Sequence, residues 1–298
     1  MKLSIDREQV KASFAKYVDK YDVEDEKILL KIKHTYRVAQ ICEKIARGLG
    51  LSDYDVDLAW LIGMLHDIGR FEQLRQYGTF VDADSIDHAH FAVKLLFDDG
   101  LIQEYVEEAS AGNAVIATEH DTVCRDAQRG DMYSGDLYLI NRAIWNHSAY
   151  RIEEGLDERI LLFSKIIRDA DKVDIFKVAY DTPLETLFGF SREDIQQATV
   201  SPEVMQAYRE EHAILRGLKK TPVDFLTGHI ALAFELEFAA SRQVMQEQGY
   251  LQKLLSFQSD NPITRQQFDE MRERMEAYLT KAADIPTVNQ DGMMRVWY

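Results

Sequence analysis

Apolar residues recur every three to four positions along most of the chain, which is the spacing of one face of an α-helix. Alternating runs typical of strands are weak, and no turn dipeptide separates two of them. All five prolines follow residue 182, so nothing before that point interrupts helices. The pattern predicts an all-α protein with helices at about 6–20, 24–49, 53–66, 86–98, 101–118, 136–147, 157–178, 202–217, 222–247 and 264–282.

Two segments without helical periodicity, 68–85 and 119–135, are predicted to be loops. The second is polar and charged, which is typical of a surface excursion, and a flap over a site is the alternative. The composition changes again near 182–200, where Pro and Gly interrupt the pattern. We therefore expect a helical core over 1–182 and a C-terminal helical extension, 183–298, packed on that core.

The apolar run that begins at Leu61 ends in two polar residues, His66 and Asp67. A run of this kind is expected to be buried, and burying an ionised carboxylate is costly unless it is paired or bound to a metal. A divalent cation beside Asp67 is the explanation that the rest of the sequence supports best.

Helical periodicity directs further polar side chains inward, because residues four apart share one face of a helix. Each of three predicted helices has such a residue four positions after an apolar one. The three residues are His34, His66 (followed by Asp67) and Asp171, and the apolar residues before them are Leu30, Ile62 and Ile167.

Two imidazoles and two carboxylates would make a mixed nitrogen and oxygen site. Such a site suits Mn, Fe, Zn, Co or Ni better than ions that prefer thiolates or oxygen alone. Four protein ligands leave coordination positions for water and substrate, which is typical of a catalytic metal.

Three short stretches around these residues resemble, in order, the motifs of the HD-domain metal-dependent phosphohydrolase superfamily. They are His-Thr-Tyr-Arg-Val at 34–38, Leu-His-Asp-Ile-Gly-Arg at 65–70 and Arg-Asp-Ala-Asp-Lys-Val-Asp at 168–174. The resemblance covers residues 24–180. It implies an HD-domain helical bundle as the core, with additional C-terminal helices, a metal at His34, His66, Asp67 and Asp171, and hydrolysis of a phosphate ester or anhydride.

Some members of that superfamily hold a second metal through additional histidines. The segment Asp-His-Ala-His at 87–90 resembles one that supplies such a ligand, and its best register selects His88 rather than His90. The segment that ends at His147 resembles another, and His120 is a further candidate. The resemblance thus implies one or two metals per chain.

The residues in and around these motifs suggest roles in catalysis and substrate binding. A metal-bound water would attack phosphorus, and Asp67 would both hold the metal and orient that water. Arg37, Arg70 and Lys172 lie one to three residues after His34, Asp67 and Asp171 and are candidates to bind phosphate. The alternative for each is a surface cation that pairs with the many carboxylates of the chain. The substrate is expected to be small and phosphorylated, such as a nucleotide.

The charge of the chain restricts its partners. Lys and Arg number 35 and Asp and Glu number 51, which gives a formal net charge of −16. Proteins that bind nucleic acids or anionic membranes present basic surfaces, so neither partner is expected.

The sequence has neither a signal-peptide pattern nor an apolar run of about 20 residues, so we expect a cytoplasmic protein. A homo-oligomer is compatible with the sequence.

Two other functions are compatible with the same residues. A binding module would keep the metal or a nucleotide without turnover and use the 202–282 region to contact a partner. A mixed-valent di-iron oxygenase, which rare relatives of the resembled fold provide, would use His88 and His147 to hold the second iron.

Overall fold

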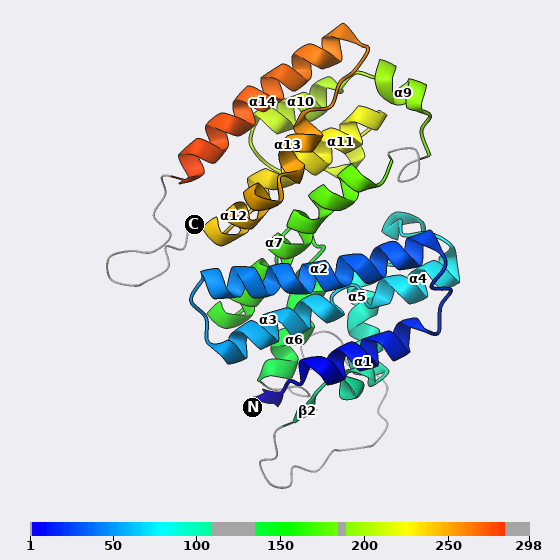
Figure 1. The fold of residues 1–298 in the computed structure, drawn as a ribbon, viewed down its shortest axis with the longest axis vertical. Coiled ribbons are helices and arrows are strands. Elements are labelled where there is room, and N and C mark those ends of the chain that lie inside the picture. The colour runs from blue at the N-terminus through cyan, green and yellow to red at the C-terminus, as the bar shows by residue number, and fades with distance from the viewer. Residues whose placement is uncertain (1, 109–134, 184–188, 284–298) are drawn as a thin grey trace. The chain divides into compact units, whose positions relative to one another are not determined.

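The computed structural model describes residues 2–108, 135–183 and 189–283, and the chain in these ranges is mostly helical (Figure 1). Within them, strand pairing is limited to Leu3–Ser4 (β1), which lies antiparallel to Glu107–Glu108 (β2). The predicted all-α fold class is therefore confirmed. In the described residues, no helix has both the length and the apolar character to cross a membrane.

The chain forms two compact units, an N-terminal unit of residues 1–168 and a C-terminal unit of residues 169–298. The boundary between them lies inside one long helix, α7 (Glu158–Asp181). The division into 1–182 and 183–298 stays a prediction.

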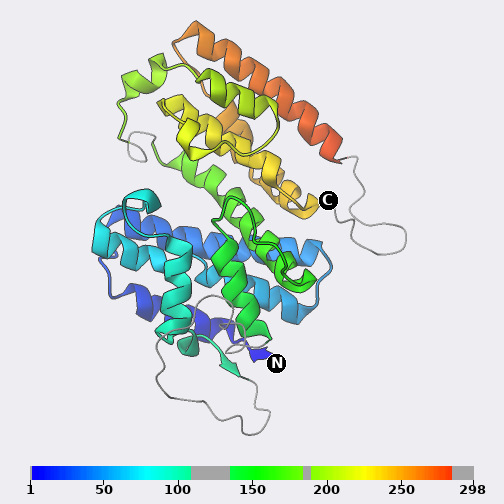
Figure 2. The same ribbon diagram turned by 180° about the vertical axis from the view of Figure 1, so that it is seen from behind.

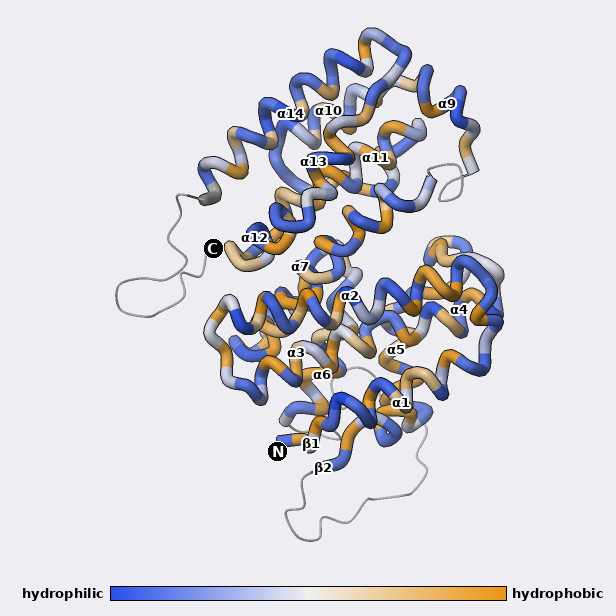
Figure 3. The backbone as a smooth tube through the Cα atoms, in the orientation of Figure 1, coloured by the Kyte–Doolittle hydropathy of each residue, from blue (hydrophilic) through white to orange (hydrophobic). Residues whose placement is uncertain are grey.

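The N-terminal unit consists of α1 (Arg7–Val18), α2 (Glu26–Gly48), α3 (Asp53–Leu65), α4 (Gly69–Tyr77), α5 (His88–Val93) with a π-helical turn at Lys94–Asp98, α6 (Asp136–Asn146) and the first part of α7. Helix α2 packs along α3, and α5 packs against both α4 and α6 (Figures 1 and 2). Hydropathy alternates along these helices, as expected of amphipathic segments with one buried face (Figure 3).

Polar residues define where the helices around the core begin. Asp25 caps α2 by accepting hydrogen bonds from the backbone of Lys27 and Ile28. Ser52 caps α3, and Asp87 caps α5. Such caps satisfy backbone N–H groups that the helix itself leaves without a partner. They fix the register of helices whose buried faces carry the polar residues described below.

A glycine allows α2 and α3 to approach closely. A Cβ atom on Gly63 would lie 2.6 Å from the Cα atom of Ala39, which is closer than real Cβ contacts. Any larger residue would force the two helices apart. Gly63 therefore sets the distance between the helix that carries His34 and the helix that ends at His66.

The C-terminal unit contains the rest of α7, α9 (Arg192–Gln197), α10 (Pro202–Arg209), α11 (Pro222–Ala231), α12 (Ala239–Gln248), α13 (Tyr250–Leu255) and α14 (Pro262–Ala283), with 3₁₀ turns at Arg216–Leu218 and Leu232–Glu235. Proline begins α10, α11 and α14, where its missing N–H has no intrahelical partner to lose.

Several predicted elements of the N-terminal unit are wrong. Segment 68–85 is not a loop throughout, because α4 occupies its first half and buries Phe71 and Gln73. This helix is short and rich in charge, so its apolar periodicity is too brief to detect. The predicted helix at 101–118 is a 3₁₀ turn at Leu101–Glu104 followed by β2, and its remainder and most of the 119–135 segment lie outside the described residues.

The predicted helices of the C-terminal unit are also corrected. The expected helix 222–247 is broken between the 3₁₀ turn and α12, because the backbone N–H groups of Glu237 and Phe238 donate to the Asp169 carboxylate instead of to helical carbonyls. The expected helix 202–217 ends at Arg209, shortly before Glu211 takes a positive φ of 59°. Helices α9 and α13 were not predicted, since each spans only six residues.

Candidate metal centre

Four imidazoles and one carboxylate come together inside the N-terminal unit. His34 lies on α2, His66 ends α3, and Asp67 follows it in the turn before α4. His88 is the first residue of α5, and His147 ends α6. All five residues are buried, with exposed fractions between 0% and 4%. Five residues from separate elements thus meet at one point of the core.

The Asp67 carboxylate is shared between two pairs of histidines. Its Oδ2 atom lies 3.5 Å from Nε2 of His34 and 3.7 Å from Nε2 of His66. Its Oδ1 atom lies 3.5 Å from Nε2 of His88 and 3.8 Å from Nε2 of His147. Each pair forms, with Asp67, a group of three potential ligands whose atoms lie within 4.8 Å of one another.

Backbone contacts determine which ring nitrogen of His66 and His147 carries the hydrogen. Nδ1 of His66 lies 2.8 Å from the carbonyl oxygen of Gly63, and Nδ1 of His147 lies 2.7 Å from that of Ile144. A carbonyl oxygen only accepts, so Nδ1 must donate in both rings. In the neutral ring the lone pair is then on Nε2, directed toward the Asp67 carboxylate. Electron pairs that face one another in this way suit a cation between them.

In His88, too, Nδ1 contacts an acceptor and Nε2 faces the cluster. Its Nδ1 lies 2.6 Å from the Asp82 carboxylate, and its Nε2 lies 3.1 Å from Nε2 of His147. Burial, reinforced by the Arg70 charge, lowers the pKa of His88 to about 4, so this imidazole is neutral at pH 7. A neutral imidazole with its lone pair on Nε2 is the form that binds metals.

Two basic side chains flank the carboxylate, one on each oxygen. Nζ of Lys31 lies 2.6 Å from Asp67 Oδ2, and Nε of Arg70 lies 3.5 Å from Asp67 Oδ1. Burial alone would raise the pKa of Asp67, but the charge of Lys31, supported by His66, holds it well below the usual range. Sequence reasoning missed Lys31, although it stands one helical turn before His34 on the same side of α2.

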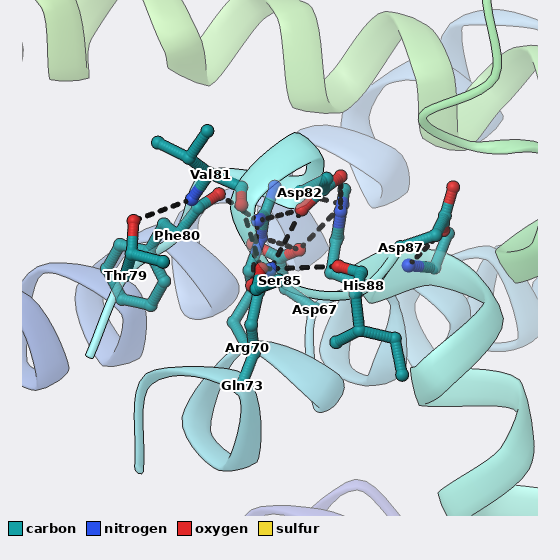
Figure 4. Close-up of polar contacts among 12 residues, drawn as sticks. Asp67, Arg70, Gln73, Thr79, Phe80, Val81, Asp82, Ser85, Asp87 and His88 are labelled. Carbon is teal, nitrogen blue, oxygen red and sulfur yellow. Dashed lines mark hydrogen bonds and ion pairs between the residues drawn. The ribbon is translucent and has the colours of Figure 1, made fainter. Parts of the chain in front are cut away.

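Arg70 is held by several protein groups at once. Its guanidinium donates to the backbone oxygen of Phe80 at 2.7 Å, to Asp82 at 2.8 Å and to Gln73 at 2.9 Å (Figure 4). It also lies 3.2 Å from Nε2 of His88. These contacts fix the guanidinium beside the cluster. A role of Arg70 in substrate binding stays a prediction.

Gly69 brings α5 against α4. A Cβ atom at this position would lie 2.7 Å from the backbone oxygen of His88 and 2.8 Å from the backbone nitrogen of Ala92. Only glycine permits this approach, so the Ile-Gly-Arg sequence after Asp67 has a direct steric role. It sets His88 within reach of Asp67.

The remaining predicted site residues do not belong to these two groups of ligands. Asp171 and Lys172 are half-buried on α7 in the C-terminal unit, where Lys172 donates to the backbone oxygen of Glu235 at 3.2 Å. Arg37 is half-buried on α2. The metal role of Asp171 and the phosphate roles of Arg37 and Lys172 stay predictions, and His120 lies outside the described residues.

The structure places the two neighbouring histidines, His88 and His90, in different surroundings. His90 is exposed and stacks on Trp145, with the ring centroids 3.5 Å apart. Its ring thus packs on an aromatic surface, whereas the ring of His88 lies in the buried cluster. The buried cluster offers imidazole nitrogen and carboxylate oxygen, which is the donor set of Mn, Fe, Co, Ni or Zn.

Comparison with known proteins agrees with this geometry. The family model described as HD domain matches residues 32–175, a range that contains every residue of the buried cluster. No curated protein and no solved structure matches the chain. Residues 32–175 therefore form an HD domain, with buried histidine and aspartate groups that could bind metal ions.

Proposed function

We propose that the protein is a metal-dependent phosphohydrolase that cleaves a phosphate ester or anhydride of a small phosphorylated substrate such as a nucleotide. One observation carries this proposal: within an HD domain, a single buried carboxylate lies between two pairs of imidazoles. His34, His66, His88 and His147 would hold one or two metals together with Asp67, and Asp171 would complete the set.

The chemistry of the donor set supports hydrolysis. A divalent cation bound there would lower the pKa of a bound water to about 7, which makes hydroxide available at neutral pH. Asp67 would orient this water through whichever oxygen lone pair the metal leaves open. The buried surroundings keep Asp67 and its neighbours in place, so little reorganisation is needed when the water attacks.

Lys31 would bind the phosphoryl group. In the structure its ammonium group neutralises Asp67 Oδ2, while its side chain remains 17% exposed. A metal at Asp67 would take over this neutralising role, since two cations compete for one oxygen. The ammonium group would then be free to pair with a phosphoryl oxygen, where negative charge grows during hydrolysis.

The size and charge of the substrate follow from the whole chain. A formal net charge of −16 disfavours long polyanions, whose binding depends on basic surfaces. A mononucleotide or another small phosphate ester needs only the local cations of the site. We therefore expect neither nucleic acid nor membrane as a partner.

Metal-dependent phosphate release from a substrate panel tests the proposal. The protein is stripped with EDTA, reloaded separately with Mn, Fe, Co, Ni or Zn, and assayed on nucleotides and simple phosphate esters. We expect activity that disappears on stripping and returns on reloading. His66→Gln should abolish it, and His90→Gln, which changes an exposed histidine of the same domain, should retain it.

Two results would contradict the proposal and identify its alternatives. Metal binding without phosphate release across the panel would indicate a binding module. Oxygen consumption by the anaerobically loaded iron form would indicate a di-iron oxygenase. Full activity of His66→Gln would exclude the buried cluster as the site of any hydrolysis that is observed.

A further inference from the structure

The segment after α4 folds back over that helix and brings an acidic residue to the cluster. Gly78 ends α4 with a positive φ of 69°, which reverses the chain. A 3₁₀ turn at Asp82–Asp84 follows, and Ser85 Oγ donates to the backbone oxygen of Val81 at 2.8 Å. Figure 4 shows Asp82 above Arg70 and Gln73 and beside His88.

Both oxygens of Asp82 have donors in the structure. Oδ2 lies 2.6 Å from Nδ1 of His88. Oδ1 accepts from Arg70 at 2.8 Å and from the side-chain amide of Gln73 at 2.9 Å. Gln73 is fully buried, and it also donates to Ser85 and to the backbone oxygen of Ile86. Asp82 is therefore fixed in one orientation with its oxygens already used.

His88 differs from its neighbours in the group that its Nδ1 contacts. His66 and His147 use neutral backbone carbonyls, whereas His88 uses a carboxylate. A carboxylate that accepts Nδ1–H fixes the tautomer and the ring plane, and it makes the opposite nitrogen a stronger donor to metal. Removing such a partner typically costs 10- to 100-fold in metal affinity.

We infer that Asp82 is a positioning residue that acts through His88 and sets the metal affinity on the Oδ1 side of Asp67. This inference rests on the metal centre of the proposed function. It assigns different support to the two pairs of histidines, one beside Asp67 Oδ1 and the other beside Asp67 Oδ2. The His88 and His147 side depends on Asp82, whereas the His34 and His66 side does not.

Metal titration of variants in the full-length protein tests the inference. EDTA-stripped protein is titrated with Mn²⁺, and free Mn²⁺ is followed by electron paramagnetic resonance. We expect two binding events in the wild type. Asp82→Ala should weaken one of them by about 10- to 100-fold and leave the other unchanged. Asp82→Asn, whose amide oxygen still accepts Nδ1–H, should weaken it less, and Asp82→Glu should restore part of the affinity.

Two controls separate positioning from general damage. Asp84→Asn changes an exposed aspartate of the same 3₁₀ turn and should leave both binding events unchanged. In a His88→Gln background, Asp82→Ala should cause no further loss of affinity, because the residue through which it acts is already gone. The wild-type spectrum should show two coupled Mn²⁺ ions, and Asp82→Ala at limiting metal should show isolated ones.

The inference is overturned if the wild type binds a single ion, if Asp82→Ala weakens both events equally, or if it still weakens binding in the His88→Gln background. None of these measurements needs turnover. A wild type that binds two ions but releases no phosphate would therefore contradict the proposed function, while the Asp82 variants would still decide the inference.

Discussion

The two units of the chain each bury a carboxylate, and they do so in opposite ways. Asp67 in the N-terminal unit faces four imidazoles and two basic side chains. Asp224 in the C-terminal unit accepts from the backbone N–H groups of Ser201, Lys220 and Thr221 at 2.7 to 2.9 Å and from the Ser201 hydroxyl at 2.7 Å. The exposed fraction is 2% for Asp67 and 0% for Asp224.

The difference separates a carboxylate whose surroundings suit a metal ion from one whose surroundings are purely structural. Asp224 is surrounded by hydrogen-bond donors, so its charge is stabilised without any added ion. Asp67 is surrounded by groups that carry charge or offer lone pairs, an arrangement that gains most from a metal. Burial alone does not separate the two, whereas the chemistry of the neighbouring atoms does.

Replacing Asp67 should have the largest effect, on metal content and on activity. Asp67→Asn removes the charge that both sides of the cluster share, so metal binding should be lost on both sides. Phosphate release should fall at least about 1000-fold, which corresponds to about 4 kcal/mol of transition-state stabilisation. Metal content by mass spectrometry and steady-state kinetics measure the two effects. Asp53→Asn, at a side chain that is 97% exposed, is the control. Retention of the wild-type metal content by Asp67→Asn would contradict the difference drawn between Asp67 and Asp224.

Replacing Asp224 should reduce stability and leave the metal content of the folded protein unchanged. Asp224→Ala leaves three backbone N–H groups and one hydroxyl without their acceptor, and we expect a loss of about 3 kcal/mol or more in the free energy of unfolding. Urea unfolding followed by circular dichroism measures it. Asp194 occupies the same position in the capping box of α9 but is exposed, so Asp194→Ala should destabilise far less. A changed metal stoichiometry in folded Asp224→Ala would contradict the assignment.

The sequence alone predicted the part of the cluster that lies on regular helices. His34 and His66 follow from four-residue spacing, because periodicity on α2 and α3 determines which side chains turn inward. His88 and His147 came only from the resemblance to a family, and the structure brings both to Asp67. The long helices α2, α3, α7 and α14 were predicted for the same reason, since each repeats its apolar spacing over several turns.

Contacts that depend on non-helical segments of the backbone could not be predicted from the sequence. Asp82 reaches His88 only because Gly78 reverses the chain after α4, a helix that the sequence pattern did not show. The break in the predicted helix 222–247 depends on Asp169, which lies far away in sequence. Periodicity reports the local conformation of the backbone and contains no information on such long-range contacts.

A partly buried histidine of the C-terminal unit, His229, should have a smaller effect, on the pH dependence of stability. His229 on α11 has a buried Nδ1 atom, although part of the residue reaches solvent. Burial, with a contribution from the Lys219 charge, lowers its pKa to about 4. His66, in contrast, lies with its Nε2 atom 3.7 Å from the Asp67 carboxylate.

The lowered pKa of His229 predicts a loss of stability on acidification. Above pH 6.5 the histidine is neutral in both the folded and the unfolded chain, so it adds no pH dependence. Between pH 6.5 and 4 the unfolded chain binds a proton that the folded chain does not, and stability falls as the pH falls. At pH 5 the loss should reach about 2 kcal/mol. Because His229→Gln removes this proton, the stability difference between variant and wild type should grow by that amount from pH 7 to 5 in urea unfolding of the EDTA-stripped proteins. A difference that stays constant with pH would show that His229 titrates alike in both states.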